Sequence, residues 1–164
     1  MVMEIISGIV AVFILYAIIV GIIDYCKFNK REKISFKESM DLTDLPIITL
    51  YNNNRRFNFM LDTGATMSLI DENVLSNLDY EESKESGTIF GLEGNKVAVN
   101  YVKAKLNYKD RDYEEEFQVM DMSAPFNHIK SENGVTLSGI LGNSFFTKYK
   151  YVLDFKELIA YSKK

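Results

Sequence analysis

Apolar residues form two kinds of pattern along this chain. Residues 5–23, IISGIVAVFILYAIIVGII, carry no charged side chain. A helix of that length reaches about 28 Å, close to the thickness of a bilayer's hydrocarbon core. The remainder has short apolar runs separated by turn residues, which is typical of β-strands. The pattern therefore predicts one membrane-spanning helix and a separate domain built from strands.

The segments predicted as strands are 47–51, 57–61, 88–90, 96–102, 104–108, 116–122, 137–141, 149–155 and 158–161. The sequence NNNRR supplies the first turn, because asparagine tolerates the left-handed backbone that a tight hairpin needs. Asp71 is a typical N-cap for one short helix over 71–78. Short strands at regular intervals, with turn signals between them, predict an all-β barrel or sandwich.

Three segments divide the chain: a transmembrane anchor (1–25), a charged juxtamembrane tether (26–44) and a folded domain (45–164). A cleaved signal peptide is the competing interpretation of the first segment, but no Lys or Arg precedes the apolar run. A buried core helix is the other alternative, and it would need a larger protein around it. Basic residues follow the run at positions 27, 30, 31, 33 and 37, which predicts a domain facing the cytoplasm.

Charge and composition narrow the chemistry. With 23 acidic and 19 basic residues, the chain lacks the basic excess of a nucleic-acid-binding protein. One histidine and one cysteine disfavour a zinc site and a Ser-His triad, so we expect no metal and no cofactor. We expect His128 on the surface of a polar loop, 123–134. The acidic stretch KDRDYEEE, 109–116, is predicted to be a solvated hairpin tip rather than a cation site, because it lacks the ligand spacing of a calcium loop.

The candidate catalytic group is Asp62, in the stretch FMLDTGATMSLID. The apolar strand before it brings the carboxylate to the edge of a cleft. Gly64 lets the chain reverse, so that backbone N–H groups point back at that carboxylate. Further along comes a second apolar segment with a central glycine, SGILGNSFF, 138–146. The tripeptide alone is a weak signal, and these companions strengthen it.

Together, LDTGATMSLI, GLEG and GILGNSFF, in that order, resemble the retropepsin family of aspartic peptidases, and most of all its single-domain bacterial-type members. The resemblance covers roughly residues 45–164 and implies a closed β-barrel. It implies that Asp62 is the catalytic aspartate, that Thr63 and Gly64 form its supporting turn, and that residues 140–142 brace this turn.

The resemblance also implies a flap over the bound peptide, formed by GTIFGLEGNK, 87–96. Its substrate-binding tip would be Gly91, Leu92, Glu93 and Gly94. Retroviral enzymes usually have a more glycine-rich tip, and a basic residue where this chain has Asn143.

An aspartic peptidase needs two carboxylates, whereas this chain has one Asp-Thr-Gly turn and no internal repeat. The second carboxylate must then come from another copy across a two-fold axis. We therefore expect a membrane-anchored, homodimeric aspartic endopeptidase that acts on protein or peptide substrates. The alternative is a catalytically silent module of the same fold, tethered to the lipid bilayer, that dimerises or binds peptides.

Overall fold

The computed structural model describes residues 2–29, 32–83, 87–90 and 96–162, which form two compact units, 1–32 and 33–164. The first unit contains helix α1 (Val2–Asn29), whose described side chains between positions 9 and 23 are all exposed. Among the residues that the structure describes, no helix combines the length and the hydrophobicity needed to cross a bilayer. The expected transmembrane helix therefore has no support from the structure.

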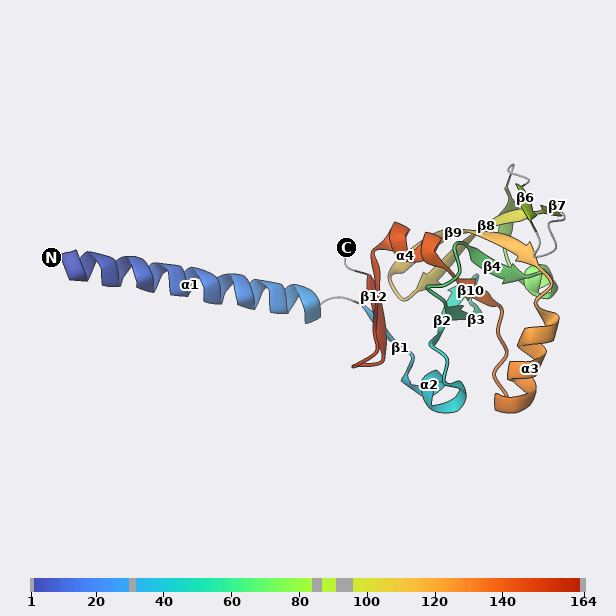
Figure 1. Cartoon of the computed structure of the whole chain (residues 1–164), viewed down its shortest axis with the longest axis horizontal. Coiled ribbons are helices and arrows are strands. Elements are labelled where there is room, and N and C mark those ends of the chain that lie inside the picture. The colour runs from blue at the N-terminus through green and yellow to red at the C-terminus, as the bar shows by residue number, and fades with distance from the viewer. Residues whose placement is uncertain (1, 30–31, 84–86, 91–95, 163–164) are drawn as a thin grey trace. The chain divides into compact units, whose positions relative to one another are not determined.

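A seven-stranded sheet forms the body of the second unit (Figure 1). Its strand order is β2-β3-β10-β4-β9-β8-β5, and a further pairing of β2 with β8 closes the sheet into a barrel. The predicted all-β barrel is thus confirmed. The strands are β2 (Ile47–Asn52), β3 (Arg55–Leu61), β4 (Ser68–Asp71), β5 (Tyr80–Glu82), β8 (Tyr101–Tyr108), β9 (Arg111–Met120) and β10 (Gly139–Leu141).

Every second side chain along β8 and β9 points into the barrel, and these side chains fill its interior. In β9, Tyr113, Glu115 and Phe117 are all buried, with Glu115 only 2% exposed. The prediction of a solvated tip for residues 109–116 is therefore wrong for Tyr113 and Glu115, whereas residues 109, 110, 112 and 114 are exposed. Only residues 109–110 form the turn, because the pairing of β8 with β9 continues up to Tyr108 and Arg111.

A second sheet contains part of the predicted tether. Its strand order is β1 (Lys33–Ser35), β12 (Ile159–Ser162) and β11 (Tyr151–Asp154). Helix α2 (Lys37–Thr43) follows β1 along the chain. Ile34 and Phe36 are 4% and 1% exposed, and belong to the main core. The expected domain boundary at residue 45 is therefore wrong: the folded unit begins near residue 33, where β1 pairs with β12.

The unit has more helix than the single one expected. Asp71 does cap a helix, accepting from the N–H of Asn73, but the helix is a 3₁₀ turn, η1 (Glu72–Asn77). The polar loop predicted over 123–134 is instead helix α3 (Ser123–Asn133), and helix α4 (Asn143–Tyr149) follows β10.

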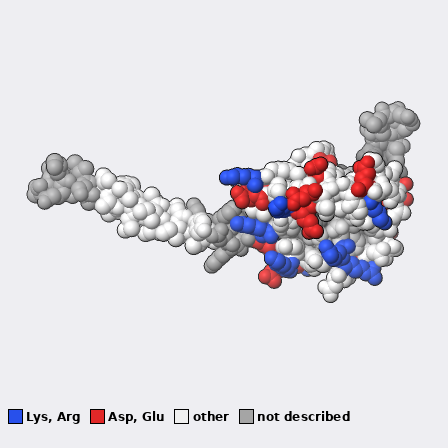
Figure 2. Space-filling model, turned by 90° about the horizontal axis from the view of Figure 1, so that it is seen from below, with Lys and Arg blue, Asp and Glu red and all other residues white. Residues whose placement is uncertain are grey.

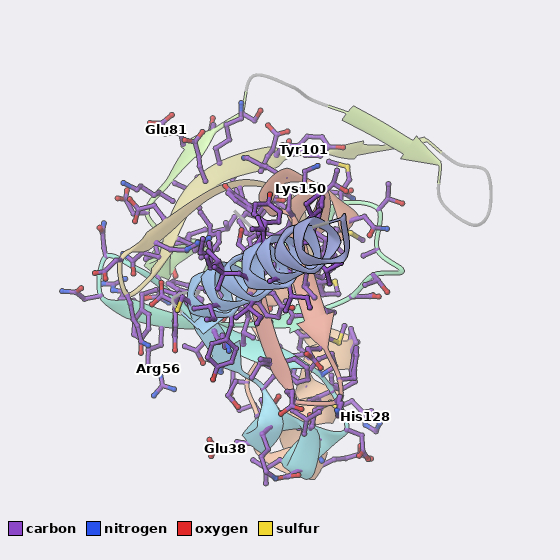
Figure 3. All side chains as sticks on the ribbon, turned by 90° about the vertical axis from the view of Figure 1, so that its left-hand side faces the viewer. Glu38, Arg56, Glu81, Tyr101, His128 and Lys150 are labelled. Atoms are coloured by element: carbon purple, nitrogen blue, oxygen red, sulfur yellow. The ribbon has the colours of Figure 1, made fainter. Side chains whose placement is uncertain are left out.

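Helix α3 is held by a few apolar side chains. Phe126 packs in a second cluster with Ile47, Leu137 and Ile140, and the helix ends at Gly134, whose φ of 73° is left-handed. His128 lies exposed on this helix, as expected, and Figure 3 labels it.

Strands β6 (Gly87–Phe90) and β7 (Lys96–Val99) form an antiparallel two-stranded hairpin (Figure 1). This is the segment expected to form the flap. The predicted tip residues Gly91, Leu92, Glu93 and Gly94 lie outside the described residues.

Candidate active site

Asp62 lies in a tight turn directly after β3, which we call the catalytic turn (residues 62–66). The backbone N–H of Asp62 donates to the carbonyl of Leu141 (3.1 Å), where β3 and β10 run side by side. The N–H of Gly64 donates back to the Asp62 side-chain oxygen Oδ1 (2.8 Å). Asp62 is half-buried, whereas Thr63 and Gly64 are exposed. The three residues predicted for the site therefore form one turn, with the carboxylate held by a backbone donor.

The segment that we call the bracing loop, residues 142–144, consists of Gly142 after β10 and the first two residues of α4, and it holds the catalytic turn through hydrogen bonds. The N–H of Asn143 donates to the carbonyl of Ala65 (2.8 Å), and its side-chain amide donates to the carbonyl of Thr63 (2.8 Å). The N–H of Ser144 donates to the carbonyl of Thr66 (3.2 Å). The contact between the two segments that the resemblance implies is therefore present. Of the expected bracing residues 140–142, Leu141 accepts from the N–H of Asp62, whereas the donors to the turn come from residues 143 and 144.

Gly142 allows the two segments to approach this closely. A Cβ atom at this position would lie 2.3 Å from the carbonyl oxygen of Met67 and 2.8 Å from that of Ala65. Sequence reasoning noted Asn143 only as a departure from the family pattern and missed its role as a brace. Its place directly after residues 140–142, the segment expected to brace the turn, was the available signal.

A buried polar cluster lies behind the bracing loop, and sequence reasoning missed it entirely. It consists of Glu115 on β9, Ser68 on β4 and Ser144 on α4. Burial raises the pKa of the Glu115 carboxyl group, while hydrogen bonds from the two serines and the charge of Lys148 oppose that rise. An acid in such surroundings binds its proton more tightly than an acid in water.

A single carboxylate on a braced turn has a limited chemistry. It can accept a proton from a water molecule, or, when protonated, donate one to an oxygen. It cannot do both at once, so hydrolysis by acid and base together needs a second group close to Asp62. The apolar residues next to the turn, among them Met60, Leu69 and Ile140, give the neighbourhood an apolar character.

Comparison with known proteins adds to this geometry. The sequence matches the family described as aspartyl protease over residues 48–145, which include Asp62 and the start of the segment after β10. Comparison with curated proteins finds no significant match.

Two solved structures are similar. One is EIAV protease complexed with the inhibitor HBY-793, at 22% identity and a TM-score of 0.48, covering 68% of this chain and 93% of that one. The other is the retroviral protease-like domain of Ddi1 from Leishmania major, at 12% identity and a TM-score of 0.51, covering 73% of this chain and 89% of that one. At such identities the likeness concerns the fold, and the second structure supports a retroviral protease-like fold.

Proposed function

This chain belongs to the aspartyl protease family, and on that premise we propose that it is an aspartic endopeptidase that is active as a homodimer. Asp62 of each copy would supply one of the two catalytic carboxylates. The substrates would be proteins or peptides, and the domain would be held at a membrane, facing the cytoplasm.

One observation carries the proposal: the chain provides a single braced Asp-Thr-Gly turn, half of what peptide hydrolysis by paired carboxylates requires. A two-fold axis passing beside the turn would bring two such turns together, so that no second catalytic turn is needed within one chain. In a homodimer, each copy would then complete the site of the other.

The paired carboxylates would act as one unit. Two such groups about 3 Å apart cannot both ionise, so the pair shares one proton. The ionised Asp62 removes a proton from a water molecule as the water oxygen adds to the peptide carbonyl carbon. The protonated Asp62 of the other copy donates to the carbonyl oxygen. As the tetrahedral intermediate collapses, the C–N bond breaks and the leaving nitrogen takes the proton that the first Asp62 gained from water. One hydroxyl of the intermediate returns its proton to the Asp62 of the other copy, so the pair again shares one proton.

The membrane part of the proposal rests on the N-terminal segment. Residues 5–23 lack charge, and the described part of α1 presents apolar side chains such as Val12, Phe13 and Leu15 that are more than half exposed. Figure 2 shows no charged side chain on the described part of α1, whereas both signs are interspersed on the visible face of the second unit. The basic residues after the run favour a cytoplasmic domain. Confinement to a membrane would raise the effective concentration of the two copies.

The test uses the full-length chain in detergent micelles and a library of fluorogenic peptides. We expect cleavage by the wild type, inhibition by a statine-containing transition-state analogue, and loss of cleavage in Asp62→Asn. The asparagine is nearly isosteric, so the variant keeps the fold and lacks only the titrating group.

Mixing the two proteins tests the shared site. Excess Asp62→Asn chain added to a constant amount of wild type should lower the activity in proportion to the share of mixed dimers. Activity that is unaffected by mixing would contradict the shared site. A wild type that binds the peptides without cutting them would favour the catalytically silent module instead.

A further inference from the structure

We propose that Glu115 is a positioning residue of the active site: its buried carboxyl group orients two serine hydroxyls that hold the bracing loop against the catalytic turn. The inference rests on the proposed function, because it assigns a role in the same reaction. It concerns a side chain outside the Asp-Thr-Gly turn and outside the flap.

Both serines donate to the same oxygen of Glu115. The distances from Ser68 Oγ and from Ser144 Oγ to Glu115 Oε1 are each 2.8 Å. Ser68 is fully buried, Glu115 is 2% exposed and Ser144 is half-buried. The three side chains come from β4, β9 and α4, so the cluster joins elements that are far apart in the sequence.

Each serine oxygen also accepts a hydrogen bond from the backbone. The N–H of Gly142 donates to Ser68 Oγ (3.2 Å), and the N–H of Ser68 donates to Ser144 Oγ (3.2 Å). A hydroxyl that accepts from an N–H on one side directs its own hydrogen elsewhere. The two Oγ atoms are 3.3 Å apart, and only one of them could donate to the other. Glu115 Oε1 is the acceptor that satisfies both hydroxyls at once.

The serines in turn belong to, or contact, the bracing loop. Ser144 is its last residue, and its N–H donates to the carbonyl of Thr66 in the catalytic turn. Gly142, which donates to Ser68, directly precedes Asn143, whose two donors bind the carbonyls of Thr63 and Ala65. The chain of contacts therefore runs from Glu115, through the serines and the bracing loop, to the residues next to Asp62.

An acid is a costly choice for packing alone. Its inward neighbours along β9 are Tyr113 and Phe117, and an apolar side chain would fill the same place without the cost of removing a carboxyl group from water. Besides filling space, the carboxyl group of Glu115 accepts hydrogen bonds from two hydroxyl groups. Small displacements of catalytic groups, of about 1 Å, lower rates by about a hundredfold, so the position of the loop matters for the reaction.

The experiment compares two substitutions of Glu115 in the full-length chain, using the library peptide that the wild type cleaves fastest. Glu115→Leu removes the acceptor, and we expect kcat to fall by about tenfold to a hundredfold while KM changes less than about threefold. Glu115→Gln keeps a side-chain carbonyl oxygen that can accept from both serines. We expect it to restore kcat to within about threefold of the wild type.

A matched control separates positioning from general stability. Asn52 is also buried, and it makes three hydrogen bonds, to Asp79 and Lys105, elsewhere in the barrel. Asn52→Ala should lower stability and leave kcat unchanged. A loss of kcat in this control equal to that of Glu115→Leu, or a Glu115→Gln variant as impaired as Glu115→Leu, would overturn the proposal.

Hydrogen exchange supplies a measurement that does not depend on activity. In Glu115→Leu, the N–H groups of Asn143 and Ser144 should exchange at least about tenfold faster than in Glu115→Gln, because they sit on the loosened loop. Should the leucine variant fail to fold, Ser144→Ala replaces it, with the same expectation for the Asn143 N–H. Equal exchange rates refute the positioning role. A wild type that cuts no peptide refutes the proposed function and leaves the exchange result to decide this inference.

Discussion

Two carboxylic acids lie close to the catalytic turn in opposite surroundings. Asp62 is half-buried at the end of β3, with a backbone N–H on its Oδ1. Glu115 is enclosed in the barrel and holds two serine hydroxyls. The first is accessible to a molecule bound at the surface, whereas the second is shielded from one. Their roles therefore follow from their environments, since the side-chain chemistry is the same.

Replacing Glu115 by Gln should change how stability depends on pH. Burial raises the Glu115 pKa above its ordinary value of 4.5, with Glu116 adding to the rise and Lys148 and the serines opposing it. The folded state then binds this proton more tightly than the unfolded state. Its contribution to stability is fully present below pH 4.5, and is lost as pH rises through the folded pKa.

The measurement is urea unfolding of the wild type and of Glu115→Gln between pH 4 and pH 8. The free energy of unfolding of the variant should rise relative to that of the wild type as pH increases, because glutamine does not titrate. All other groups titrate in both proteins and cancel in the difference. A difference that stays constant across this range would contradict the prediction.

At the scale of elements, the junction between β10 and α4 determines where the catalytic turn sits. β10 is inserted between β3 and β4, so its end delivers the bracing loop beside the end of β3. The approach is close because Gly142 has no side chain. A strand of three residues thus positions the bracing loop beside the turn that β3 carries.

Gly142→Ala tests this junction. The added methyl group would meet the carbonyl oxygens of Met67 and Ala65, so the loop must shift. We expect a loss of stability of about 1–3 kcal/mol together with a marked loss of peptide cleavage. Urea unfolding and the fluorogenic peptide assay measure the two effects.

Gly134→Ala is the matched control for Gly142→Ala. No described atom lies within 4 Å of the added methyl, but the φ of 73° disfavours alanine. Its stability should fall by about 1–2 kcal/mol with cleavage unchanged. Equal losses of cleavage in both variants would show that Gly142 has no special relation to the site.

Helices α3 and α4 show where local patterns mislead. The stretch that forms α3 is polar, with Pro125 near its start, and its apolar residues Phe126 and Ile129 make only a narrow stripe. These two side chains indicate a helix only when the structure shows that they pack against Leu137 and Ile140. In α4, the adjacent phenylalanines at 145 and 146 are both buried. The stretch therefore shows neither the spacing of three to four residues that predicts a helix nor the alternation that predicts a strand.

For the whole molecule, the division between the two units differs from the one expected. Residues 33–36 carry β1 and Phe36, and Phe36 packs edge-on against Phe155 near the other end of the chain. They therefore belong to the folded unit. The first unit then comprises residues 1–32.

A chain of residues 33–164 tests this division and the proposed anchor together. We expect it to fold with the stability of the full-length protein, because it keeps β1 and the core. It should be released from membranes by alkaline carbonate, whereas the full-length chain stays bound. At equal total concentration, it should also dimerise less than the full-length chain held in membranes.

Fractionation, urea unfolding and concentration-dependent peptide cleavage measure these three properties. Release of the full-length chain by carbonate would remove the anchor from the proposal. Loss of folding on deletion of residues 1–32 would show that the boundary lies elsewhere. Equal dimerisation with and without these residues would exclude a role for the membrane in assembly.

The sequence by itself determined the tight turn at Asp62 and most of the barrel strands. Each depends on residues that are neighbours in the chain: the glycine of a turn, the alternation of a strand. Only the tertiary structure decided that Glu115 faces inward onto two serines, that 123–133 is a helix, and that β1 pairs with β12. These depend on residues distant in sequence, because burial and hydrogen-bond satisfaction are set by what lies opposite, which no local pattern contains.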